Sequence, residues 1–136
     1  MAVNLALAMV QGGKRVGILD ADIFGPSIPR LLSLSSQPRT NDSDPLNYAL
    51  LMADNRLIPL SNYGLKAMSM GFLVPPESAI VWRGLMVMKA LQQLLHEVDW
   101  GGLDVLVIDM PPGTGDTQLT ITQQIFLDGS SICEYD

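Results

Sequence analysis

Residues 105–116, VLVIDMPPGTGD, constrain the fold more than any other stretch of the sequence. Four apolar residues run into Asp109, and such a solidly apolar run is typical of a strand buried on both faces of a parallel sheet. Pro111 and Pro112 follow at once, and proline fits neither a central strand nor a helix interior. The stretch therefore predicts a buried strand that brings a carboxylate to its carboxyl end and is followed by a loop.

The rest of the chain alternates between apolar strands and helical patterns. Short apolar runs predict strands at 15–20, 65–70 and 103–109. Apolar residues at helical spacing predict helices at 2–11 and 85–98. Strands of this kind separated by helices indicate an α/β fold, with a mainly parallel sheet flanked by helices. We expect the three strands to lie side by side, with 103–109 inside the sheet rather than at an edge.

We interpret residues 1–136 as a single partial domain that is incomplete at both ends. The opening helix has no strand before it, and the last helical pattern has no apolar strand after it. Residues 35–62 combine a polar, turn-rich stretch with a short hairpin pattern, so we expect a loop and hairpin insertion there. Residues 126–136 are too polar for a core strand and are expected to form an irregular tail.

The composition excludes some classes of function. The chain has 136 residues and is 48% hydrophobic, which is enough for one domain with its own core. It carries 8 Lys and Arg residues against 14 Asp and Glu residues, a formal net charge of -6. Nucleic acids and anionic membranes require a basic surface, so we expect neither as a partner, and no segment reaches the ~20 apolar residues of a transmembrane helix. The single cysteine, Cys133, excludes a disulfide within the chain.

Asp109 is the candidate metal ligand. A carboxylate at the end of a buried strand lies close to a medium of low dielectric constant and is stabilised by a cation. The Walker B acid of P-loop nucleotide hydrolases has this position and holds Mg²⁺. The loop of Pro111, Pro112 and Gly113 would then be free to respond to a terminal phosphate, as switch loops do. The simpler interpretation, in which Asp109 only caps a turn, stays open for the acid taken alone.

Asp20 and Asp22 form a second acidic motif, at the end of the strand expected at 15–20. Their spacing puts both side chains on one face if the strand continues, and on different sides if a turn begins at once. One of them could orient an attacking water or belong to the metal shell, although acids are also ordinary turn residues. We expect Asp22 and Asp109 to share one cleft, where like charges raise the pKa of at least one carboxylate unless a cation is present.

Five segments together resemble the Mrp/ApbC family, the iron–sulfur cluster carrier ATPases of the deviant Walker A class that are related to MinD. The similarity covers about residues 2–125, with the motifs in the family's order. The segments are VNLALAM, GKRVGILDADIFGPSIPRLL, NYGLKAMSMGFLV, VWRGLMVMKALQQLL and LDVLVIDMPPGTGDTQLT. The run MSMGFLV followed by VWRGLMVM is most similar to the mitochondrial branch, whose members assemble respiratory complex I.

The resemblance implies a P-loop NTPase fold of the MinD-like (SIMIBI) class and a homodimer that encloses ATP and Mg²⁺. It also implies a [4Fe–4S] cluster that a Cys-x-x-Cys pair bridges between protomers and that passes to client apoproteins. For this branch the compartment would be the mitochondrion, with the cytoplasm as the alternative. By position, Asp109 resembles the Walker B acid, and the loop at 111–113 resembles switch II. Asp22, with Asp20 as second choice, resembles the switch I acid that positions water.

Two departures from the family pattern bear on activity. The glycine-rich phosphate loop with its two lysines should end directly before Val3, and the Cys-x-x-Cys pair should lie beyond residue 136. We therefore expect residues 1–136 to be a fragment that is inactive as an ATPase on its own. Two alternatives stay open: a non-catalytic product that docks onto a full-length partner, and a nicotinamide-binding Rossmann domain in which Asp20 holds a ribose. A MinD- or ParA-like positioning ATPase lacks support, because the sequence shows no basic amphipathic helix or DNA-binding patch.

Overall fold

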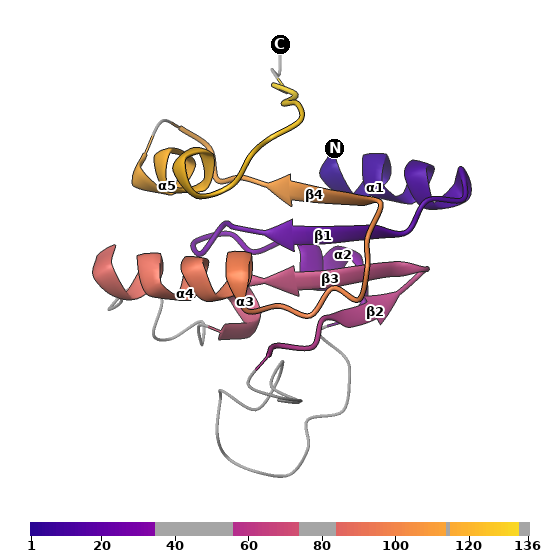
Figure 1. Ribbon diagram of the computed structural model, residues 1–136, viewed down its shortest axis with the longest axis horizontal. Coiled ribbons are helices and arrows are strands. Elements are labelled where there is room, and N and C mark those ends of the chain that lie inside the picture. Colours follow the sequence, from indigo (N-terminus) through magenta and orange to yellow (C-terminus); the bar gives the residue numbers. More distant parts are fainter. Residues whose placement is uncertain (35–55, 74–83, 114, 134–136) are drawn as a thin grey trace, which may run out of the picture.

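The computed structural model describes residues 1–34, 56–73, 84–113 and 115–133. In this part of the chain, one four-stranded sheet has the order β2-β3-β1-β4 (Figure 1). The strands are β1 (Val16–Asp20), β2 (Leu60–Asn62), β3 (Leu65–Ser69) and β4 (Val105–Asp109). β1 pairs in parallel with β3 on one side and with β4 on the other, while β2 runs antiparallel to β3. The mainly parallel α/β sheet that the sequence predicted is confirmed.

Helices cover both faces of this sheet (Figure 1). One face packs against α1 (Ala2–Gln11) and α2 (Ile28–Leu31), and the other against α3 (Met70–Leu73), α4 (Gly84–His96) and α5 (Asp116–Gln124). Alternation along β1 serves both cores: Val16 and Ile18 join the core under α1 and α2, and Leu19 joins the core under α4. This is why the strand is apolar without a polar face. None of the helices in the described ranges has the length and apolar character to cross a membrane.

β4 corrects one expectation. The sequence predicted that 103–109 lies inside the sheet, but β4 is an edge strand among the described residues, with β1 as its one partner. All five residues of β4 are half-buried, whereas all five residues of β1 are buried. Helical cores on both faces of β4 account for its apolar sequence without a second neighbouring strand. The expected interior position is therefore wrong, because an apolar run reports burial of its faces and not the pairing of its edges.

The β2–β3 hairpin turns at Tyr63 and Gly64, whose φ angles of 51° and 77° both lie in the left-handed region. Two consecutive residues with positive φ match the tight turn that connects twisted antiparallel strands. Most of the insertion expected at 35–62 lies outside the described residues, which include only its last part. Residues 126–133 contain no helix or strand. The proposed domain boundaries stay predictions.

Candidate functional site

Asp20, Ser69 and Asp109 are the last residues of three neighbouring strands. The register pairs Asp20 with Ser69 of β3 and with Asp109 of β4. Because the three strands are parallel, these residues meet at one edge of the sheet, where the arrowheads of β1, β3 and β4 lie in Figure 1. Partnered positions of parallel strands present their side chains to the same face, here the face covered by α1 and α2. Sequence reasoning had singled out the two acids but not Ser69.

Asp20 is almost completely buried, with 1% of its surface exposed. Its carboxylate accepts hydrogen bonds from the backbone N–H groups of Asp22 and Ile28 and from the hydroxyl of Ser69, each at 3.1 Å. Burial is the largest cause of a raised pKa at Asp20; the three hydrogen bonds oppose the rise, and the charge of Asp109 adds to it. Both carboxylate oxygens are engaged, so Asp20 anchors its surroundings rather than facing a ligand.

Asp22 lies in the loop that follows β1. Because β1 ends at Asp20, the turn begins at once, and the two acids separate: Asp20 is buried and Asp22 is half-buried. The Oδ1 atom of Asp22 accepts hydrogen bonds from the N–H groups of Phe24 at 3.0 Å and Gly25 at 3.1 Å. No described residue donates a hydrogen bond to its Oδ2 atom. One oxygen of Asp22 therefore shapes the loop, and the other is available to a ligand.

Asp109 is half-buried, and its side chain has no hydrogen-bond partner among the described residues. Its backbone carbonyl accepts a hydrogen bond from the N–H of Ala21 at 2.9 Å, which ties the strand end to β1. Burial is the largest cause of a raised pKa at Asp109; the terminal amine of Met1 opposes the rise, and the charge of Asp22 adds to it. The sequence led us to expect a pKa raised by like charges; the pKa of Asp109 is raised, but mainly by burial, and the charge of Asp22 contributes less. That Asp22 and Asp109 share one cleft stays a prediction.

Gln118 shapes the loop after β4, and the sequence analysis had not singled it out. Its side-chain NH₂ donates hydrogen bonds to the carbonyl oxygens of Pro111 at 2.7 Å and Gly113 at 2.9 Å. Its Oε1 atom accepts a hydrogen bond from the N–H of Gly115 at 2.9 Å. Since Pro111 and Pro112 have no N–H, Gly113 supplies the one backbone N–H within 111–113, at a φ of 97°. A glutamine three residues after the helix N-cap was the available signal.

The acids at this edge fit Mg²⁺ better than a metal that takes all its ligands from the protein. Within the described residues, no group of three His, Cys, Asp or Glu side chains comes together as a metal site. Mg²⁺ usually binds to one or two carboxylates and takes its other ligands from water and substrate phosphates. Asp109, alone or with the free oxygen of Asp22, meets that requirement. Asp20 does not meet it, because both of its carboxylate oxygens already accept hydrogen bonds.

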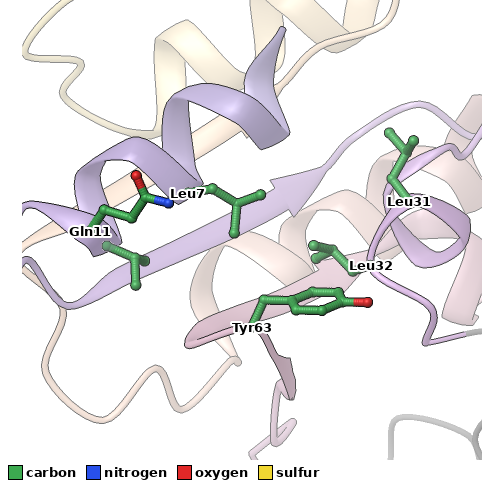
Figure 2. Close-up of a pocket in the computed structure, with 6 residues that line it drawn as sticks. Leu7, Gln11, Leu31, Leu32 and Tyr63 are labelled. Atoms are coloured by element: carbon green, nitrogen blue, oxygen red, sulfur yellow. The ribbon is translucent and has the colours of Figure 1, made fainter.

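Two hollows in the structure lie away from these acids. One, of about 520 Å³, lies between α1, α2 and the β2–β3 turn (Figure 2), and is lined by Leu7, Val10, Gln11, Leu31, Leu32 and Tyr63. It contains no acidic side chain.

The other, of about 200 Å³, lies at the amino ends of the strands and includes Lys14, Arg15 and Lys66. Arg15 forms an ion pair with Asp104 at 2.8 Å, and the Lys66 ammonium donates a hydrogen bond to the carbonyl of Trp100 at 2.6 Å. These three cations therefore lie at the edge opposite Asp109.

Comparison with known proteins decides the family. The family model ParA, described as NUBPL iron-transfer P-loop NTPase, matches residues 1–134. The chain belongs to this family. A mouse protein named iron–sulfur cluster transfer protein NUBPL is 50% identical over 133 residues, which cover 96% of this chain and 38% of the mouse protein. The iron–sulfur cluster carrier protein of Escherichia coli is 47% identical over 131 residues, which cover 96% of this chain and 33% of that protein.

A solved structure shares the fold. The nucleotide-binding protein of Archaeoglobus fulgidus, in complex with ADP, has 37% sequence identity and a TM-score of 0.66. The match covers 90% of this chain and 42% of that chain. The P-loop NTPase class that the sequence resemblance implied is thus confirmed. The chain spans less than half the length of each of these relatives.

Proposed function

We propose that this chain is the core of an ATP-dependent iron–sulfur cluster carrier, in which Asp109 holds the Mg²⁺ of the bound nucleotide. Relatives named as cluster transfer or carrier proteins support the carrier role, and the ADP complex of the structural neighbour supports nucleotide binding. The observation that carries the site is the half-buried Asp109 carboxylate, unpartnered within the described residues and within reach of the Asp22 charge. When bound, Mg²⁺ supplies positive charge to the phosphates of the nucleotide.

The residues of this edge have distinct proposed roles. The free oxygen of Asp22 would orient the attacking water, which makes Asp22 the first choice for the catalytic acid. Asp20 would hold the loop that carries Asp22, because both of its oxygens already accept hydrogen bonds. The N–H of Gly113 would face the terminal phosphate, with its orientation set by the contacts of Gln118.

The start of α1 supports a phosphate at the same edge. The terminal amine of Met1 influences the pKa of Asp109, so the first turn of α1 lies within electrostatic reach of the strand end. Helix N-termini present backbone N–H groups and a positive dipole end to anions. A nucleotide whose phosphates meet this helix end would therefore have its Mg²⁺ beside Asp109.

We further propose that the cargo is a [4Fe–4S] cluster, which a homodimer in the mitochondrion delivers to apoproteins of complex I. An Arabidopsis thaliana relative, named iron–sulfur protein required for NADH dehydrogenase, mitochondrial, is 46% identical over 132 residues and supports this client and compartment. Cys133 is exposed and is the one cysteine of residues 1–136. A [4Fe–4S] cluster takes four cysteine ligands. We therefore assign the nucleotide part of the activity to this segment, and not the cluster ligands.

Asp109→Asn is expected to stabilise the metal-free protein at neutral pH and to abolish its response to Mn²⁺. Because the pKa of Asp109 is raised, the stabilisation that it contributes is fully present below the ordinary pKa of aspartate and is lost as pH rises through the raised value. Because Asp109 is partly exposed and its charge is screened by solvent, the variant should gain only a small amount of unfolding free energy at pH 7, and nothing near pH 3. Mn²⁺ at about ten times its Kd should add roughly 1.4 kcal/mol to the wild type alone. Urea titrations with and without Mn²⁺ measure both effects.

Asp128→Asn is the matched control, since it removes the same charge from an exposed carboxylate. It should change neither the pH dependence of stability nor the response to Mn²⁺. If Asp109→Asn keeps the Mn²⁺ stabilisation of the wild type, the metal assignment is wrong. If that variant is no more stable than the wild type at pH 7, the electrostatic account of Asp109 is wrong.

A further inference from the structure

We propose that Ser69 and Gly71, at the junction of β3 and α3, are positioning residues that fix loop 21–27 and, with it, Asp22. The proposal rests on the proposed function, in which Asp22 orients water. Neither residue belongs to the loop that it would hold. Two contacts connect the junction to the loop: a buried chain of hydrogen bonds and a close packing contact.

Loop 21–27 is held at both of its ends by one carboxylate. Asp20 accepts a hydrogen bond from the N–H of Asp22, near the start of the loop, and from the N–H of Ile28, directly after its end. Ser27 occupies the N-cap position of α2, but its side chain makes no capping hydrogen bond. The N–H of Ile28 is one of the first donors of α2, which have no partner within the helix, and Asp20 satisfies it. The path of the loop depends on how the Asp20 carboxylate is oriented.

Ser69 sets that orientation. Its side chain is fully buried, and its hydroxyl donates a hydrogen bond to Oδ2 of Asp20 at 3.1 Å. The hydroxyl oxygen of Ser69 accepts a hydrogen bond from the N–H of Gly71 at 3.0 Å, which fixes the hydroxyl itself. Among the described residues, Ser69 is the one side chain that donates to Asp20. Hydrogen bonds to an ionised acceptor are stronger than those between neutral groups, so losing this one would leave the carboxylate held only by the N–H groups of the loop that it positions.

Gly71 forms the second contact with the loop. A Cβ atom at Gly71 would lie 2.9 Å from Cβ and 3.0 Å from Cγ of Pro26, and 3.3 Å from the hydroxyl oxygen of Ser69. Gly71 is not among the residues with positive φ, so the close approach and not the backbone conformation requires glycine. The Pro26 ring is rigid and cannot move aside by changing rotamer. A side chain at position 71 would therefore displace the loop.

The first test uses ¹⁵N-labelled protein of residues 1–136, with Mn²⁺ as the paramagnetic probe. In the wild type, Mn²⁺ bound at Asp109 should relax the amide of Asp109 and the amides of loop 21–27 in a fixed ratio. Ser69→Ala is expected to keep the relaxation at Asp109, to lower the ratio for the loop, and to speed hydrogen exchange at the amide of Ile28. Ser69→Thr keeps the hydroxyl and should restore both readouts. Ser61→Ala, at an exposed position of β2, is the matched control and should change neither.

The second test perturbs the packing contact with Pro26 while Ser69 keeps its hydroxyl. Gly71→Ala should displace the amide resonances of loop 21–27 and lower the same relaxation ratio, while the Ser69 hydroxyl remains present. Gly129→Ala is its control, because an added Cβ at Gly129 meets no atom within 4 Å. Gly71→Ala also keeps the proposal testable if the Ser69→Ala protein is unfolded and gives no dispersed spectrum.

The outcomes separate this proposal from the proposed function. If Mn²⁺ relaxes no amide near Asp109 in the wild type, the metal assignment fails, while exchange at Ile28 and the loop shifts still test the positioning role. If Mn²⁺ binds and both Ser69→Ala and Gly71→Ala leave the loop ratio, exchange and resonances as in the wild type, the positioning role is overturned. Failure of Ser69→Thr to restore the Ser69→Ala losses would overturn the part assigned to the hydroxyl.

Discussion

Gly17→Ala is expected to lower the free energy of unfolding by about 2 kcal/mol, within the ~1–3 kcal/mol that overpacking a core costs. An added Cβ would lie 2.5 Å from Cδ1 of Leu103 and 2.9 Å from two ring atoms of Trp100. Gly17 is buried in the central strand β1, so the backbone cannot retreat without disturbing both parallel neighbours. Both obstructing side chains precede β4, and their displacement should also weaken Mn²⁺ binding at Asp109. Urea titration measures the stability, and a Mn²⁺ titration measures the binding.

Gly84→Ala is the matched control for this prediction. Gly84 begins α4, and an added Cβ there meets no atom within 4 Å. Because alanine restricts the unfolded chain and favours helix, this variant should be as stable as the wild type or more stable by up to about 1 kcal/mol. If both variants have wild-type stability, the packing of Leu103 and Trp100 on Gly17 does not constrain the fold.

The sequence predicted the elements of the fold better than their pairing. The strands at 15–20, 65–70 and 103–109 were found because a strand buried on both faces must be apolar throughout, and that pattern is local. The edge position of β4 could not be read in this way, because helices packed on both faces require apolar side chains whether or not a second strand pairs with the edge. The short helix after Ser69 was missed for a similar reason, since four apolar residues fit a strand or a helix equally well.

For the site too, the sequence predicted individual residues better than the contacts between them. Asp109, Asp22 and Asp20 were predicted because a carboxylate after a buried strand breaks the local pattern. Their separate environments were not predictable, because Asp20 is hydrogen-bonded to Ser69, which is 49 residues away in the chain. For Gln118 the sequence held only a weak signal, which is its position three residues after the N-cap of α5. Polar residues that serve a site through another residue carry no local pattern of their own.

Three cationic side chains lie at the edge of the sheet opposite Asp109. Lys14, Arg15 and Lys66 lie around the hollow at the amino ends of the strands, opposite Asp109. The run Gly12, Gly13 and Lys14 follows α1 and precedes β1, so it also belongs to that opposite edge. It therefore cannot serve as the phosphate loop of a nucleotide bound at Asp109. In the family pattern, the glycine-rich loop would instead meet the start of α1.

Joining the family's glycine-rich loop, with its lysines, to the amino end of residues 1–136 is expected to raise the affinity for Mg²⁺-ATP at least about a thousandfold. Each charge-assisted hydrogen bond that the loop adds is worth roughly 1.5–3 kcal/mol, so three exceed ~4 kcal/mol, or about three factors of ten. Calorimetric titration should show no micromolar binding by residues 1–136 and clear binding by the extended chain. Asp109→Asn in the extended chain should remove the dependence of binding on Mg²⁺. Tight binding by residues 1–136 alone would show that the loop is dispensable, and a folded extended chain that binds no ATP would refute the role of Asp109.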